Sequence, residues 1–172
     1  GIYLSSSSIS GGIENTGEII GNDGDGISLG GEGGSVITGD IFNDEDAIIS
    51  GADTGISLTS DGDGSVIFGD IDNYGTISGG NYGISLSGAS TITGTVYNDG
   101  TIEGGSTGIY VGNSSNISGG INNTDSIIGG EGRSAIVVSN GSITGGIDNS
   151  GIIDGSASGS AIYMTGLTSA LD

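Results

Sequence analysis

Six complete copies of one pattern run along this chain, and this repetition restricts the fold more than any other feature. Each copy opens with a small residue, then Ile, a variable residue and an apolar residue. The openings lie 25 to 29 residues apart, at Gly1, Gly26, Gly55, Gly83, Gly108, Ala135 and Ala161. Units of this length that combine short apolar segments with glycine turns are typical of solenoids, in which each unit buries its apolar side against the next.

Alternating polarity within each repeat predicts short strands. In residues 26–29, Ile and Leu alternate with smaller residues, which gives an extended segment one apolar face. A second segment, Ile-x-x-x-Ile-x-Asn, places its Ile and Asn side chains on one side, with a bend at Gly39 in residues 37–43. A third carries Ile-x-Gly, as in residues 77–79. We therefore expect an all-β fold: a parallel β-helix, or β-solenoid, of six coils of about 25 to 29 residues, each with three short strands.

An asparagine occupies one position in every complete repeat, six residues after an isoleucine. A side-chain amide both donates and accepts hydrogen bonds, so identical Asn residues stacked at strand spacing can bond to one another along a column. We interpret these residues as a structural ladder in preference to a ligand-binding row: Asn15, Asn43, Asn73, Asn98, Asn123 and Asn149.

The charge of the chain excludes several classes of partner. The sequence has 21 acidic residues and one basic residue, Arg133, for a net charge of −20. Nucleic acids and anionic membrane surfaces are therefore not expected as partners, because both are bound through Lys and Arg. The sequence has no run of about 18 to 20 apolar residues, so it predicts no membrane-spanning helix.

Two acidic glycine turns, residues 22–26 and 61–64, are the candidates for metal binding. Carboxylates that are stacked beside backbone carbonyls suit Ca²⁺. The predicted calcium ligands are Asp23, Asp25, Asp61 and Asp63. The acidic turns do not recur in every repeat, and we expect no other cofactor.

Catalysis is the weakest of the functional interpretations. The chain lacks His, Lys and Cys, so the usual bases and nucleophiles are missing apart from carboxylates and hydroxyls. Asp40 and Asp70 fall in the same slot of successive repeats, about 4.8 Å apart if they pair in register, and Asp72 lies two residues on. A two-carboxylate glycosidase is the distant alternative. The sequence otherwise predicts a protein that is not an enzyme.

The Ile-x-Asn-x-Gly-x-Ile-x-Gly cassette, as in residues 71–79 and, with Val in the first place, in residues 96–104, resembles the passenger repeats of bacterial autotransporters and related large surface adhesins. This resemblance covers nearly the whole chain. It implies a right-handed β-helix that is secreted and displayed at the bacterial cell surface, or outside the cell, as a fibre adhering to host or neighbouring cells. The chain departs from the family in lacking a C-terminal β-barrel translocator and a Gly-Asp-Ser-Gly protease motif.

Residues 1–172 form a single predicted solenoid segment whose ends resemble ordinary strands and not polar caps. Such a segment is either an excerpt of a longer rod or a filament subunit that self-associates end to end. A structural and adhesive surface fibre is the leading hypothesis, and a calcium-stabilised extracellular matrix or S-layer-like filament is the alternative. The candidate contact points are the aromatic residues expected to face outward: Tyr3, Phe42, Tyr97, Tyr110 and Tyr163.

Overall fold

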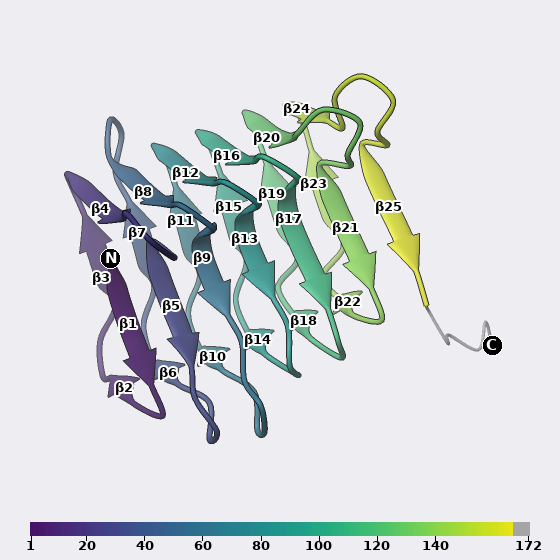
Figure 1. The fold of residues 1–172 in the computed structure, drawn as a ribbon. Coiled ribbons are helices and arrows are strands. Elements are labelled where there is room, and N and C mark those ends of the chain that lie inside the picture. Colours follow the sequence, from purple (N-terminus) through teal and green to yellow (C-terminus); the bar gives the residue numbers. More distant parts are fainter. Residues whose placement is uncertain (167–172) are drawn as a thin grey trace.

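The chain forms a parallel β-solenoid, as the repeats predict. A computed structural model describes residues 1–166. Within this part of the chain there are 25 strands and no helix, and every strand pairing is parallel. Figure 1 shows the coils stacked side by side from the N-terminal end to the C-terminal end, so that equivalent strands form sheets running the length of the rod.

Each coil contributes one strand to each of four sheets, and sheets 1 and 2 contain the first two strands of the coils. Sheet 1 has seven strands: β1 (Ile2–Ser5), β5 (Ile27–Gly30), β9 (Thr54–Leu58), β13 (Tyr82–Leu86), β17 (Thr107–Gly112), β21 (Ile136–Ser139) and β25 (Ile162–Thr165). Sheet 2 has six: β2 (Ser8–Ile9), β6 (Val36–Ile37), β10 (Val66–Ile67), β14 (Thr91–Ile92), β18 (Asn116–Ile117) and β22 (Ser142–Ile143).

The other two sheets complete the coil. Sheet 3 consists of β3 (Ile13–Asn15), β7 (Ile41–Asn43), β11 (Ile71–Asn73), β15 (Val96–Asn98), β19 (Ile121–Asn123) and β23 (Ile147–Asn149). Sheet 4 consists of β4 (Glu18–Gly21), β8 (Ile48–Gly51), β12 (Thr76–Gly79), β16 (Thr101–Gly104), β20 (Ser126–Gly129) and β24 (Ile152–Asp154).

The predicted second segment of each coil is two strands and not one, so a coil has four short strands where we expected three. In the second coil, β6 ends at Ile37 and β7 begins at Ile41, with a bend at residues 38–40. The bend turns the chain while both isoleucines stay fully buried. Gly39 is needed there, because a Cβ atom on it would lie 2.8 Å from the backbone nitrogen of Gly12 in the preceding coil.

The core is a set of apolar columns produced by exact register between coils. Ile56 of β9 pairs with Ile27 of β5 and Ile84 of β13, and all three have no exposed surface. The same relationship links the leucines two residues later. Because neighbouring parallel strands lie about 4.8 Å apart, each side chain contacts its counterparts above and below, and the interior is filled by stacking alone.

Sheet 4 ends each coil at a sharp corner, which explains the Ile-x-Gly signature. At Gly79 a Cβ atom would lie 2.0 Å from the carbonyl oxygen of Tyr82, and at Gly104 it would lie 1.9 Å from that of Thr107. The chain folds back on itself so closely that no side chain fits. Glycine at these positions is therefore a steric requirement of the corner.

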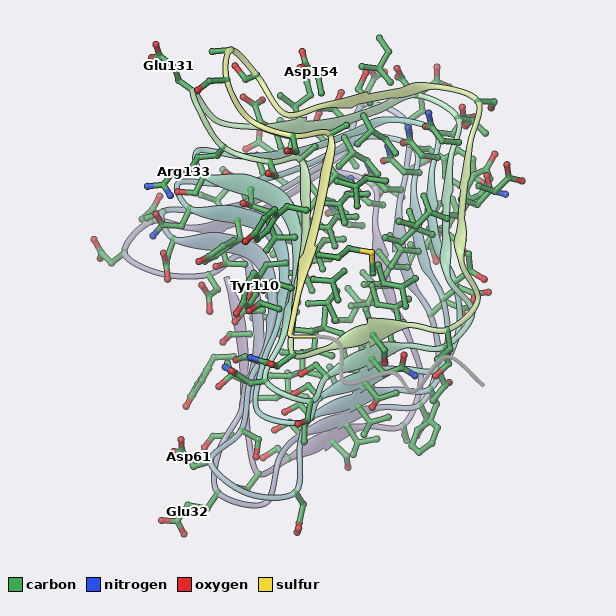
Figure 2. The ribbon with its side chains drawn as sticks, turned by 90° about the vertical axis from the view of Figure 1, so that its right-hand side faces the viewer. Glu32, Asp61, Tyr110, Glu131, Arg133 and Asp154 are labelled. Carbon is green, nitrogen blue, oxygen red and sulfur yellow. The ribbon has the colours of Figure 1, made fainter. Side chains whose placement is uncertain are left out.

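Viewed along the axis, the coils wind in a right-handed sense around the packed interior (Figure 2). This is the sense that parallel crossover connections adopt. Loops project beyond both ends of sheet 1, one group near Glu131 and Arg133 and the other near Glu32 and Asp61, and Tyr110 lies on the outer face between them (Figure 2).

Candidate functional site

The six ladder asparagines form one continuous column inside the rod. Five hydrogen bonds of 2.7–2.8 Å join them, each from the side-chain nitrogen of one Asn to the side-chain oxygen of the next. The four inner members have no exposed surface: Asn43, Asn73, Asn98 and Asn123.

Each ladder amide also holds the backbone of its corner. The side-chain nitrogen of Asn73 lies 3.2 Å from the carbonyl oxygen of Gly75 and 3.1 Å from that of Thr101 in the next coil. One side chain therefore links the backbone carbonyls of two successive coils at the corner. This position fixes the turn between sheets 3 and 4 and offers no open face for a ligand.

A second buried ladder, made of serines, was missed by the sequence reasoning. The backbone N–H of Ser65 donates to the hydroxyl oxygen of Ser90 across 3.0 Å, and that of Ser90 donates to Ser115 across 3.1 Å. The hydroxyl of Ser90 in turn donates to the carbonyl of Ser87. A signal was present, because a serine stands two residues before the sheet 2 isoleucine in five of the six coils. Among the described residues, every buried side-chain nitrogen or oxygen has a partner.

The predicted calcium ligands are divided between two corners of the coil. Asp23 and Asp25 lie in the turn between β4 and β5, before a sheet 1 strand, whereas Asp61 and Asp63 lie in the loop after β9. Asp61 is at the tip of a projecting loop (Figure 2). The structure therefore does not bring the two pairs together. In residues 1–166 no three or more acidic side chains are clustered in a way that could hold a metal ion.

Asp40 and Asp70 are adjacent, as their common slot predicts, and both serve the corners of the coils. A carboxylate oxygen of Asp40 accepts the backbone N–H of Asp70 at 2.8 Å. A carboxylate oxygen of Asp70 likewise accepts the N–H of Thr95 at 2.6 Å. These side chains bond one coil to the next at the bend before sheet 3.

The outer surface of sheet 3 carries a checkerboard of aromatic and acidic residues, here called the aromatic–acidic patch. In one column Asp72 pairs in register with Phe42 on one side and with Tyr97 on the other. The next column contains the residues that follow the ladder asparagines, where Tyr74 lies between Asp44 and Asp99. The patch consists of Phe42, Asp44, Asp72, Tyr74, Tyr97 and Asp99.

Tyr74 joins the rings of this patch into one row. Its ring centroid lies 5.4 Å from that of Phe42 and 5.6 Å from that of Tyr97, at tilted angles of 44° and 50°. These separations are within the range of favourable aromatic pairs. A shallow groove of about 380 Å³ runs beside the row and is lined by Phe42, Asp44, Glu45, Tyr74 and Asp99. Tyr74 is 38% exposed, so the row is accessible from solvent.

The patch perturbs the ionisation of its own residues. Partial burial raises the pKa of Asp72 above its ordinary value, and the charges of Asp70 and Asp40 add to the shift. Burial and the charge of Asp72 also raise the pKa of Tyr74, which keeps its phenol neutral near neutral pH. The carboxyl groups of Asp44, Asp72 and Asp99 flank the aromatic row, and the patch has no basic residue. Of the patch residues, the sequence reasoning named Phe42 and Tyr97 as contact points and missed Tyr74.

A second groove, of about 490 Å³, lies on sheet 1 beside the only basic residue of the chain. Its lining includes Tyr82, Tyr110, Arg133 and Tyr163. The rings of Tyr82 and Tyr110 are 5.4 Å apart. Two of the predicted contact residues, Tyr110 and Tyr163, thus share this groove, whereas Tyr3 lies at the opposite end of the same sheet and is 72% exposed.

The fold and these surfaces define the class of protein as a β-solenoid repeat protein with a polar, mostly acidic exterior. Comparison with known protein families, with curated proteins and with solved structures gives no match. Within residues 1–166, no helix is long and apolar enough to cross a membrane.

Proposed function

We propose that this chain acts as a structural and adhesive fibre protein at a bacterial cell surface or outside the cell, in the manner of the autotransporter passengers that its cassettes resemble. The observation that carries the proposal is that the polar ladders and the apolar columns both run along the rod from coil to coil. The Asn ladder runs through all six coils without a break, from Asn15 to Asn149. Such an interior supports a rod of constant cross-section that presents its side walls to partners.

The position of the acidic pair favours this role over catalysis. A glycosidase needs two carboxyl groups that face a sugar and can exchange protons with it. Asp40 and Asp70 instead accept backbone N–H groups of the following coil. Replacing both with Asn and finding unchanged release of reducing sugar from a panel of polysaccharides would remove the enzymatic alternative, whereas loss of a measurable activity would establish it.

A calcium-stabilised filament is the second candidate, because Asp23 with Asp25, and Asp61 with Asp63, lie in glycine turns suited to oxygen ligation. Thermal unfolding with excess calcium and with a chelator tests this directly. A shift of the unfolding temperature that disappears in the variant with all four Asp residues changed to Asn would support calcium. Identical unfolding curves with calcium and with the chelator would exclude a calcium-stabilised filament.

The fibre itself can be tested by electron microscopy and by adhesion. End-to-end self-association is part of the proposal, because the coils stack through the same parallel pairing along the whole described rod, so that a further coil could pair in the same way. We expect rods of uniform width whose length increases with concentration. We also expect beads coated with the chain to bind cell layers, and beads coated with the heat-denatured chain not to bind. Equal capture of both beads would contradict an adhesive role.

A further inference from the structure

We infer that the aromatic–acidic patch is a docking surface for an Arg- and Lys-rich segment of a partner protein. This inference rests on the proposed adhesive role and names the chemistry of the partner. The argument starts from the checkerboard, in which each carboxylate of the patch has an aromatic residue beside it along its column. Asp72 lies between Phe42 and Tyr97, and Tyr74 lies between Asp44 and Asp99.

The combination of rings and carboxylates selects a cation. The face of an aromatic ring attracts a guanidinium or ammonium group, and the attraction is stronger where the site is partly desolvated. A carboxylate beside the ring can bind the same group through charge and hydrogen bonds. Arginine suits both, because its planar guanidinium stacks on rings and pairs with carboxylates in a forked geometry.

The electrostatics of the patch exclude the other classes of occupant. Anionic ligands would meet the carboxylates of Asp44, Glu45, Asp72 and Asp99 with no base among the groove residues. A second copy of this chain lying on this side wall would bring another net charge of −20 with one basic residue, so like charges would oppose its docking at the patch. Burial raises the pKa of Asp72 and the charges of Asp70 and Asp40 raise it further, so a cation bound beside Asp72 would favour its ionised form. Charge complementarity therefore points to a different, basic chain.

The stacking of the coils adds geometric fit. Three successive coils contribute the ring row, with centroids 5.4 and 5.6 Å apart. An extended polypeptide lying along the rod places side chains of one face about 6.6–6.8 Å apart, which is close enough to this spacing for neighbouring basic residues to reach successive rings and carboxylates. The groove of about 380 Å³ beside Tyr74 accommodates a side chain of arginine size.

The test measures binding of a fluorescent nona-arginine peptide by anisotropy, with nona-lysine and an uncharged Gly-Ser peptide of equal length as comparisons. Tyr74→Leu removes the central ring and keeps the net charge at neutral pH. We expect it to weaken nona-arginine binding about tenfold at 150 mM salt. Tyr3→Leu is the matched control, since it removes an exposed aromatic at the end of sheet 1, and we expect a change of less than twofold. Tyr74→Trp, which retains a ring, should keep the wild-type affinity.

Two results would overturn the inference. One is equal affinity of the Tyr74→Leu and Tyr3→Leu variants, which would mean that the peptide is held by general attraction to an acidic rod. The other is Tyr74-dependent binding of a neutral oligosaccharide without binding of nona-arginine, which would make the patch a sugar platform. Asp99→Asn provides a second variant, expected to weaken binding while leaving the rings in place.

The failure of this inference is separable from failure of the proposed function. If coated beads bind cells and the Tyr74→Leu chain binds them equally well, adhesion stands and uses another surface. If the peptide binds through Tyr74 and the beads do not adhere, the docking surface stands and the adhesive role falls.

Discussion

The side-chain nitrogen of Asn98 donates to the side-chain oxygen of Asn123 across 2.7 Å in the closed interior of the rod. Residue 122, also an asparagine, has its side chain on the outer face of the same strand. The two neighbours thus differ in environment and not in chemistry. This pair permits a test of the ladder with identical substitutions at adjacent positions.

Asn123→Ala should destabilise the protein strongly. It removes the hydrogen bond that Asn123 accepts from Asn98 and the three that its side-chain nitrogen donates, to Asn149 and to the carbonyls of Asp125 and Ile152. A hydrogen bond contributes about 0.5–1.5 kcal/mol net, so we expect the loss of these four bonds to cost about 2–4 kcal/mol. Asn122→Ala should change stability by no more than about 0.5 kcal/mol. Denaturant titration followed by circular dichroism measures both, and similar midpoints would mean that the ladder does not stabilise the fold.

Ser90→Ala should reveal the serine ladder. The buried N–H of Ser65 would lose its acceptor, at a cost of about 1–3 kcal/mol. Ser87, three residues earlier in the same connection, is only partly buried, and its side chain is the matched control. We expect Ser87→Ala to unfold at nearly the wild-type denaturant concentration. Hydrogen exchange at the Ser65 amide gives a local reading, and unchanged protection in Ser90→Ala would argue against this bond.

Gly79→Ala should weaken the corner after sheet 4. The added methyl would lie 2.0 Å from the carbonyl oxygen of Tyr82, so the backbone must move and strain neighbouring coils. We expect a loss of at least about 2 kcal/mol, as for other changes that force backbone shifts. Gly17→Ala has open space around the added atom and should be nearly neutral. A comparison of melting temperatures separates the two, and equal losses would show that the corner can relax.

Asp72→Asn should stabilise the protein at neutral pH. Because the pKa of Asp72 is raised on folding, its protonated form favours the folded state. That contribution is fully present below about pH 3.8 and is lost as the pH rises through the folded pKa. The free energy of unfolding, measured by denaturant titration, should therefore be higher for the variant than for the wild type at pH 7. The difference should vanish toward pH 3.

Asp148→Asn is the charge-matched control for this prediction. Asp148 occupies the same outward slot in β23, but glycines stand where Asp70 and Asp40 flank Asp72. The expected gain at pH 7 is smaller for Asp148→Asn. Equal gains in the two variants would show that stabilisation comes from lowering the net charge and not from the site of Asp72.

The sequence allowed prediction of the coil and its register because both depend on local spacing. Isoleucines at fixed separation and one Asn per repeat indicate which side chains point inward, and Ile37, Ile41 and Asn43 are all buried together. The bend at Gly39 was not predicted to separate two strands. The inward-facing positions alternate in the same way whether this segment is one straight strand or two strands joined by a bend. We therefore expected three strands per coil where the structure has four.

The surface was less predictable than the interior. Phe42 and Tyr97 could be placed outward from alternation, but Tyr74 follows the strand and reaches back between them, which depends on side-chain packing across three coils. The paired Asp turns were placed in one candidate set because their compositions match. Their separation reflects connections at opposite ends of sheet 1, which composition does not encode.

All of the bonds between coils run along the axis of the rod, and this direction governs how the protein responds to pulling. Tension applied at the two ends loads the pairings of only the outermost coil, so coils would detach in succession. Each detached coil of 25 to 29 residues would replace about 4.8 Å of rod with about 85–100 Å of extended chain. A cell tethered through such a rod would be held by a line that lengthens in steps under load, dissipating work before the attachment breaks.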